Sequence, residues 1–259
     1  MLTFVTSINK KYWDEGSRTN IASWLKFFPK DCQILIFEEN RIPDKFNDPR
    51  LKWLDLNKEC PELLTFAERY KDNPHYNGEK TKKLREKFRW NAIKFAHKTF
   101  PLFRAKEIVG KGQLIWLDAD VLAIRPLTPV FVGKMCPPSK AVSYLGRPST
   151  WSECGFVYYN LNIQEGHDFL DMFKEYYTVD GMLDDLRETH DSFVFDQVRV
   201  NFPQEKQNML LDINAHSQTN KHPFHESLLR ECLTHHKGSN KTRKQLKFLK
   251  RYNLNELRY

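Results

Sequence analysis

The feature that most constrains this chain is a five-residue apolar run that stops at two aspartates. Residues 113–117 read Q-L-I-W-L, and Asp118, Ala119 and Asp120 follow directly. A short continuous apolar run is typical of a strand buried on both faces of a parallel sheet. Such a strand cannot hold two carboxylates in its interior, so we expect Asp118 and Asp120 at its carboxyl end, where open α/β sheets bind ligands. One intervening residue should place both carboxylates on the same side of an extended chain.

The rest of the chain predicts an α/β fold. Apolar or β-rich runs predict strands at residues 2–8, 33–37, 113–117, 141–145 and 156–159, whereas helical patterns occupy residues 22–28, 80–108 and 168–177. Pro101 should kink or end the second helix, and residues 192–200 fit a strand or a helix. Strand–helix–strand order at the start predicts a Rossmann-like, mostly parallel sheet flanked by helices. No repeat or flexible linker divides the chain, so we expect a single domain.

Composition excludes some classes of protein and leaves others open. Apolar residues make up 40 % of the chain and aromatic residues 14 %, which is too much for a disordered protein. The formal net charge of +8 predicts an anionic partner, which could be nucleic acid, a membrane surface or a phosphorylated small molecule. No stretch is long and apolar enough to span a membrane, and the first residues do not resemble a signal peptide. We therefore expect a cytoplasmic protein, with peripheral membrane contact through its basic C-terminus as a further option.

Two carboxylates at the end of a strand can hold a metal ion. Asp118 and Asp120 supply the oxygen ligands that a hard divalent cation prefers, and such a cation can in turn bridge a diphosphate. The plainer interpretation is that the two aspartates only cap the strand or begin a turn. The five widely spaced cysteines include no Cys-x-x-Cys pair, so they predict reduced thiols and no cysteine-based structural zinc site.

A second motif lies near the C-terminus and reads H-H-K-G-S-N-K from His235 to Lys241. A histidine, either His235 or His236, could add an imidazole ligand to a manganese-like ion. Gly238 permits a close backbone approach to a phosphate, and Lys241 can neutralise the phosphate charge.

Together the two motifs resemble those of metal-dependent glycosyltransferases of the A-type fold, and in particular the glycogenin and lipopolysaccharide galactosyltransferase family. That family pairs a strand ending in D-x-D with a C-terminal H-x-x-G-x-x-K, and both patterns occur here. The resemblance implies that Asp118, Asp120 and His235 hold Mn²⁺ or Mg²⁺. It also implies that Asp118, Ala119 and Asp120 contact the nucleotide diphosphate, and that Gly238 and Lys241 do so as well. In that family, the first strand is followed by an Asn and a Tyr that contact the nucleotide. The residues here that are similar to this pattern are Thr6, Ser7, Asn9 and Tyr12.

Two further stretches match the family in part. Its N-[SA]-G-x-x-x-x-N begins here with Glu153 in place of the asparagine and ends at Asn160. Its D-Q-D-x-x-N reads Asp196-Gln197-Val198-Arg199-Val200-Asn201. The resemblance implies that Asp196 and Gln197 lie near the anomeric carbon of the donor, and it places Glu153 in the same catalytic region.

Basic residues precede the D-x-D strand. On the predicted helix, Lys87, Asn91, Lys94 and Lys98 share one face. In transferases of this shape such a helix often presents a cation to the donor phosphates, so we expect Lys94 or Lys98 to do so. The plainer interpretation is a solvated basic face.

Other conspicuous residues receive structural interpretations. Trp90, Trp116 and Phe95 should belong to the core. Single histidines should be polar surface or satisfied interior groups; they are His97, His167, His190, His216, His222 and His225.

The function that these patterns predict is metal-dependent transfer of a sugar from a nucleotide sugar, in particular a UDP-sugar, to a hydroxyl acceptor such as a glycan. Residues 1–130 would bind the nucleotide sugar, residues 131–234 the acceptor, and residues 235–259 would close over the diphosphate. Gln197 favours retention of configuration, whereas inversion needs a carboxylate base, for which Glu153, Asp191 and Asp196 are candidates. The alternative is a basic nucleic-acid-binding protein or a D-x-D metal-dependent nuclease. The sequence favours this less, because the basic C-terminus has few aromatic residues to stack on bases.

Overall fold

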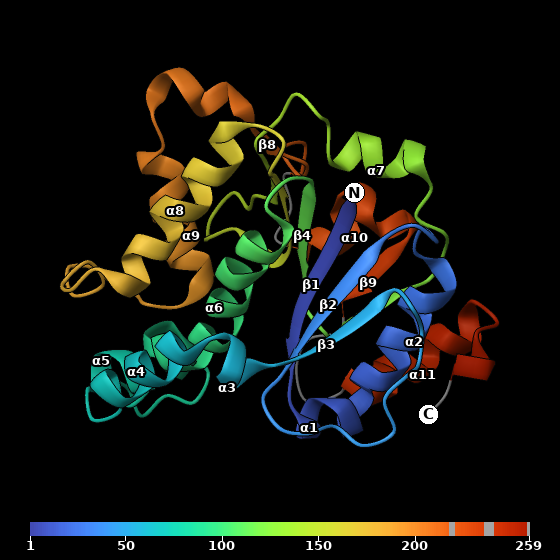
Figure 1. The fold of residues 1–259 in the computed structure, drawn as a ribbon, viewed down its shortest axis with the longest axis horizontal. Coiled ribbons are helices and arrows are strands. Elements are labelled where there is room, and N and C mark those ends of the chain that lie inside the picture. Colours follow the sequence, from blue (N-terminus) through green and yellow to red (C-terminus); the bar gives the residue numbers. More distant parts are fainter. Residues whose placement is uncertain (218–220, 236–240, 258–259) are drawn as a thin grey trace.

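The computed structural model of the chain describes residues 1–217, 221–235 and 241–257 (Figure 1). Within them a seven-stranded sheet has the strand order β3-β2-β1-β4-β7-β6-β8. Its strands are β1 (Leu2–Ile8), β2 (Gln33–Glu38), β3 (Leu51–Asp55), β4 (Gln113–Leu117), β6 (Val142–Leu145), β7 (Glu153–Asn160) and β8 (Leu210–Asp212). All neighbours in the sheet are parallel except that β7 is antiparallel to both β4 and β6. The predicted mostly parallel sheet is confirmed.

A two-stranded antiparallel ribbon joins the region after the D-x-D motif to the C-terminal motif. Its strands are β5 (Val121–Ala123) and β9 (Leu233–His235), and Val121 pairs with His235. This pairing brings two motifs that are far apart in the sequence to the same place.

Helices cover both faces of the sheet. They are α1 (Lys10–Tyr12), α2 (Arg18–Phe27), α3 (Leu56–Glu59), α4 (Pro61–Tyr70), α5 (Pro74–Asn77), α6 (Ala92–Val109), α7 (Pro129–Met135), α8 (Gln164–Thr178), α9 (Asp191–Asn201), α10 (Pro223–Glu226) and α11 (Lys241–Arg251). Short π- or 3-10 segments are η1 (Trp13–Ser17), η2 (Lys87–Trp90), η3 (Gln204–Met209), η4 (Leu228–Glu231) and η5 (Asn255–Leu257). No helix in these described ranges is long and apolar enough to cross a bilayer.

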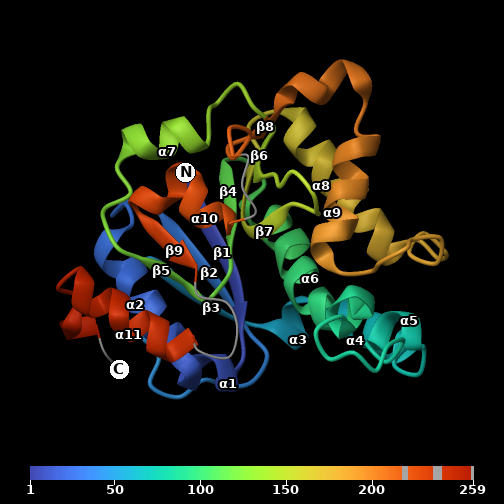
Figure 2. The same cartoon turned by 180° about the vertical axis from the view of Figure 1, so that it is seen from behind.

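Alternation along the strands divides the core into two layers. In β4, Leu114 and Trp116 face the layer under α4, α6, α8 and α9, whereas Ile115 and Leu117 face the layer under α2, α7 and the β5–β9 ribbon. Figures 1 and 2 show these two sets of helices on opposite sides of the sheet. A strand that is covered on both faces must be apolar throughout, which is why β4 is a continuous apolar run.

The helix predicted over residues 80–108 is wrong in its first part. Residues 80–86 form no helix, η2 follows, and α6 begins only after Asn91. The Asn91 side chain accepts a hydrogen bond from the backbone N–H of Lys94 and thereby caps the helix. Lys87 therefore does not share a helix face with Lys94. The helix continues through Pro101, which is buried, and ends at Gly110.

Residues 192–200, whose pattern fitted either a strand or a helix, belong to helix α9. Trp116 is buried as expected, but Trp90 and Phe95 are only partly buried. Phe95 instead faces a cavity, described next.

Candidate functional site

A cavity of about 770 Å³ opens at the carboxyl ends of β1 and β4. This is the edge at which a parallel α/β sheet binds its ligands, and the volume is in the range of small-molecule sites. Its walls are formed by Ser7, Tyr12, Ser17, Phe88, Lys94, Phe95, Lys98, Trp116, Asp118, Ala119, Asp120, Arg147, Thr150, Trp151, Glu153, Cys154, His190, Asp191, Ser192 and His235.

The D-x-D motif forms a turn at the end of β4. The backbone N–H of Asp118 donates to the carbonyl of Gly155, and the N–H of Val121 donates back to the carbonyl of Asp118. The Asn20 side chain donates to the carbonyl of Ala119 at 2.8 Å. These bonds hold Asp118 and Asp120 at the carboxyl end of β4, beside the cavity, as the sequence predicted.

Lys98 lies between two carboxylates at the base of the cavity. Its Nζ is 2.9 Å from Asp118 Oδ1 and 2.9 Å from Asp191 Oδ2, and it also donates to the carbonyl of Cys154. Burial disfavours the Lys98 ammonium, but Asp118 and Asp191 outweigh that effect and hold its pKa well above the ordinary value. Burial likewise disfavours the Asp191 carboxylate, yet Lys98 keeps the pKa of Asp191 below the ordinary value. Lys98 and Asp191 therefore stay oppositely charged at neutral pH.

His235 lies against the D-x-D turn because β9 pairs with β5. Its Nε2 is 2.6 Å from Asp120 Oδ1 and 4.0 Å from Asp118 Oδ2. Ligand atoms of these three residues lie within 4.8 Å of one another. Lys98 and the Trp116 indole N–H both bind Asp118 Oδ1, which leaves Oδ2 as the atom that faces His235. Two carboxylates and one imidazole fit a manganese-like ion, so the residues predicted as metal ligands are brought together.

Glu153 lies on the other side of His235. It is buried, its Oε1 is 3.8 Å from His235 Nδ1, and its Oε2 is 3.4 Å from His222 Nε2 and 3.8 Å from Arg147 Nη1. Gly155 makes this approach possible, because a Cβ at that position would lie 2.9 Å from the His235 ring and 3.0 Å from Glu153 Oε1. A side chain at position 155 would therefore displace the His235 ring or the Glu153 carboxylate.

The N-terminal residues that were predicted to meet a nucleotide take different positions. Ser7 and Tyr12 line the cavity. Thr6 is buried within the sheet, and Asn9 caps α1 by accepting from the N–H of Tyr12 and donating to Glu39. The structure thus brings two of these four residues to the cavity.

The residues predicted near the anomeric carbon are not among those that line this cavity. The Asp196 carboxylate accepts hydrogen bonds from Ser152 and pairs with Arg199, and it faces a neighbouring cavity of about 600 Å³. Gln197 lines neither cavity. Both residues lie one to two turns along α9, whereas the residues at the start of that helix face the main cavity.

Sequence reasoning underestimated the residues at the start of α9 and one distant histidine. The sequence presents Asp191 only as a candidate base for inversion, and His190 and His222 only as isolated histidines. A signal for Asp191 and His190 was available, because the polar residues His190, Asp191 and Ser192 precede an apolar run and so mark a helix start, and helix N-termini can bind anionic groups. No sequence signal identifies His222, since only the fold brings it near Glu153.

The remaining predicted positions lie partly inside and partly outside the described residues. Lys94 and Lys98 both line the cavity, but Lys94 is exposed and Lys98 is the one that reaches Asp118. Gly238 and His236 lie outside the described residues. Lys241 begins α11, and its side chain lies outside the description.

Comparison with solved structures identifies the fold. The galactosyltransferase LgtC, in complex with donor and acceptor sugar analogues, matches with a TM-score of 0.55 at 12 % identity, over 98 % of this chain and 96 % of that one. An active-site mutant of LgtC matches with a TM-score of 0.54 at 10 % identity, over 96 % of each chain. No family model and no curated protein sequence matches. The likeness confirms the predicted A-type glycosyltransferase fold.

Proposed function

We propose that this protein transfers a sugar from a nucleotide sugar, in particular a UDP-sugar, to a hydroxyl acceptor such as a glycan. The observation that carries the proposal is the set of Asp118, Asp120 and Lys98 on the wall of the main cavity, at the carboxyl ends of β1 and β4. In a fold shared with LgtC, this is where charged groups can meet a nucleotide diphosphate.

The donor would occupy the main cavity. Asp118, Asp120 and His235 would hold Mn²⁺ or Mg²⁺, which supplies positive charge to the departing diphosphate. Ser7 and Tyr12 line the same cavity and would contact the nucleotide. From the motif alone, Gly238 and Lys241 would contact the diphosphate as well. These parts come from residues 1–130 and 235–259, the segments proposed to bind the nucleotide sugar.

The acceptor would occupy the neighbouring cavity. The two cavities share Arg147 and Thr150, and the second is also lined by Asp196 and Asn214. The two cavities are therefore adjacent, as a donor site and an acceptor site must be. These residues belong to the proposed acceptor-binding part, residues 131–234.

The positions of the carboxylates favour retention of configuration. Asp191 is paired with Lys98. Asp196 lines the proposed acceptor cavity, but both of its carboxylate oxygens already accept hydrogen bonds from Ser152 or Arg199. Neither carboxylate is therefore free to act as a base. Glu153 is buried between His222 and His235. Inversion needs a carboxylate that can take the proton of the hydroxyl, whereas retention does not need a separate base there.

The main catalytic task of these residues is electrostatic. The ion held by the aspartates would stabilise the charge that develops on the leaving diphosphate, and Lys98 would offset the charge of Asp118 beside that ion. Lys98 also orients Asp118 through the bond to Oδ1, which leaves the other oxygen directed toward His235.

A thermal-shift and hydrolysis assay tests the proposal. The protein is incubated with a panel of nucleotide sugars, with and without Mn²⁺, beside Asp120→Ala. We expect stabilisation by one nucleotide in the presence of metal, slow donor hydrolysis, and a rate at least about 10²-fold lower in Asp120→Ala. The absence of nucleotide stabilisation in the wild type, or its full persistence in Asp120→Ala, would contradict the proposal. Once a donor is found, NMR of the first-formed product reports the anomeric configuration.

A polynucleotide titration tests the nuclease or nucleic-acid alternative in parallel. Binding driven by the net charge weakens steeply as salt rises and does not depend on Asp120. Metal-dependent cleavage of DNA or RNA that Asp120→Ala abolishes would support the nuclease instead.

A further inference from the structure

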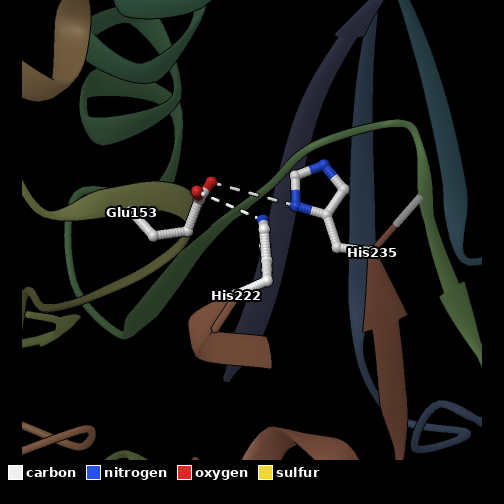
Figure 3. A group of neighbouring side chains, drawn as sticks. All are labelled: Glu153, His222 and His235. Carbon is white, nitrogen blue, oxygen red and sulfur yellow. Dashed lines mark ion pairs between the residues drawn. The ribbon is translucent and has the colours of Figure 1, made fainter. Parts of the chain in front are cut away.

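Glu153, His222 and His235 converge from three separate segments on one point beside the D-x-D turn. Figure 3 shows the Glu153 side chain from β7, the His222 side chain from the residue before α10, and the His235 side chain from β9 pointing toward one another. Ligand-type atoms of the three residues lie within 4.8 Å of one another. The group differs from the glycosyltransferase motif, in which an asparagine occupies the position of Glu153.

The separations suit a tetrahedral cation. Glu153 Oε2 is 3.4 Å from His222 Nε2, and Glu153 Oε1 is 3.8 Å from His235 Nδ1. Two atoms that each lie about 2.1 Å from a tetrahedral zinc ion are about 3.4 Å apart. A small movement of the side chains would therefore complete the geometry. Two histidines and one glutamate form a donor set that zinc uses in proteins, with a fourth position left for water or another ligand.

The hydrogen bonding of His235 provides an independent observation. The short contact from Nε2 to Asp120 Oδ1, 2.6 Å, places the ring proton on Nε2. In neutral imidazole, Nδ1 then carries a lone pair. This nitrogen is buried, has no hydrogen-bond partner among the described residues and faces the Glu153 carboxylate. Two electron-pair donors that face each other in a buried site need a positive charge between them, which a metal cation or a second ring proton can supply.

We propose that Glu153, His222 and His235 form a binding site for a zinc-like divalent cation, separate from the ion at Asp118 and Asp120. In this arrangement His235 ligates through Nδ1 while its Nε2–H donates to Asp120. A carboxylate that accepts the second ring proton of a metal-bound histidine fixes the tautomer and orientation of the ring. Asp120 is placed to do this here.

His222 must present Nε2 to the ion, so the proton of its neutral ring must lie on Nδ1. That nitrogen now accepts a bond from the N–H of Phe224 at 3.4 Å. The distance is beyond the usual range of such a bond, so its loss is a small cost beside metal ligation. Arg147, 3.8 Å from Glu153, also donates to the carbonyls of Trp151 and Ser152 and can keep those partners when a cation binds.

Direct binding measurements test the site. Zinc is titrated into metal-free full-length protein by calorimetry, and Co²⁺ serves as a spectroscopic probe of tetrahedral coordination. We expect one ion per chain with a tetrahedral Co²⁺ spectrum, and an affinity reduced by at least about tenfold in both His222→Ala and Glu153→Gln. The control His225→Ala removes an exposed histidine of the same α10 turn and should bind as the wild type does.

A third variant separates this site from the ion at the aspartates. Asp118 is not one of the three ligands, so Asp118→Asn should retain zinc binding. The proposal is overturned if the wild type binds no zinc, if His222→Ala and Glu153→Gln bind it unchanged, or if Asp118→Asn abolishes it. Circular dichroism is recorded for each variant, because His222→Ala could affect folding. If His222→Ala is unfolded, the result for Glu153→Gln tests the site alone.

A second readout rests on the proposed function. A neutral His235 can offer only one lone pair, so zinc at Nδ1 prevents Nε2 from ligating an ion at Asp118 and Asp120. Zinc should therefore weaken Mn²⁺-dependent nucleotide binding in the wild type but not in His222→Ala. If the protein binds zinc but no nucleotide, the proposed function fails and the zinc site stands.

Discussion

Lys98 shows how one side chain can organise a site. It is the ammonium group beside Asp118 and Asp191, and it also contacts the Trp116 ring, with Nζ 5.2 Å from the ring centroid. The side chain is mostly buried, so its charge is compensated by these partners more than by water. Removal of one member of such a group leaves a buried charge without compensation.

Lys98→Met should destabilise the protein by about 3 to 5 kcal/mol, because Asp118 and Asp191 would then repel each other in a buried site. Adding Asp191→Asn should recover part of this loss. Urea denaturation of the two single variants and the double variant measures the coupling. Additive effects in this cycle would show that the two side chains do not interact energetically.

The same group predicts how stability depends on pH. The pKa of Asp191 is lower in the folded protein than in the unfolded chain, where it is about 3.9, so the stabilisation is present above that value and is lost as pH falls. The pKa of Lys98 is raised, so its contribution is present below about 10.4 and is lost at higher pH. Between pH 3 and pH 6, the free energy of unfolding of Lys98→Met/Asp191→Asn should vary less than that of the wild type. Equal slopes in the two proteins would exclude this contribution.

At the scale of elements, the first turn of α8 packs tightly on the end of β7. A Cβ at Gly166 would lie 2.0 Å from the backbone carbonyl oxygen of Asn160, which cannot move without shifting the strand. A Cβ at Gly133, in α7, would meet nothing within 4 Å. Both glycines are helical, but only position 166 lacks the space for a Cβ.

Gly166→Ala should destabilise the protein by about 1 to 3 kcal/mol through steric overlap. Gly133→Ala is the matched control and should stabilise it by up to about 1 kcal/mol, since alanine favours helix over glycine. Thermal unfolding of both variants gives the sign of each effect. A stabilised Gly166→Ala would mean that α8 can move away from β7 at little cost.

At the scale of the whole molecule, the C-terminal helix α11 is connected to the D-x-D turn through Asn20 of α2. The buried Gln245 side chain donates to the Gly16 carbonyl and to Asn20 Oδ1, and Asn20 in turn donates to the Ala119 carbonyl. Leu249 packs with Leu122 and Ile124 in a small apolar cluster. The last part of the chain thus supports the same turn that carries the proposed metal ligands.

Leu249→Asp should release α11 from this cluster, because a buried aspartate without a partner is strongly disfavoured. We expect trypsin to cleave the basic helix at least about tenfold faster, since the equilibrium population of the open form rises by that factor for each 1.4 kcal/mol. Leu246→Asp, at an exposed position of the same helix, is the control. Equal cleavage of the two variants would indicate that the cluster does not hold the helix.

Local patterns were sufficient for much of the fold and part of the site. The run at residues 113–117 predicted β4 with its observed bounds and placed Asp118 and Asp120 at its carboxyl end, because a strand covered on both faces excludes charge from its interior. The start of α6 was missed, since helical periodicity extended through residues 80–91 and the capping role of Asn91 was not recognised. Propensity is a weak guide where a cap and tertiary packing decide the boundary.

The arrangement of the site depended on contacts between distant segments. Asp191 lies at the first residue of α9 and reaches Lys98, whereas Asp196, further along the helix, pairs with Arg199. The loop before α10 brings His222 to Glu153, and the pairing of β9 with β5 places His235 between Glu153 and Asp120. The sequence determines the chemistry of each side chain, and its spacing indicates the face of the helix or strand on which that side chain lies. Which of these side chains meet follows from how the elements pack, because that packing is set by the burial of the whole core and by no single segment.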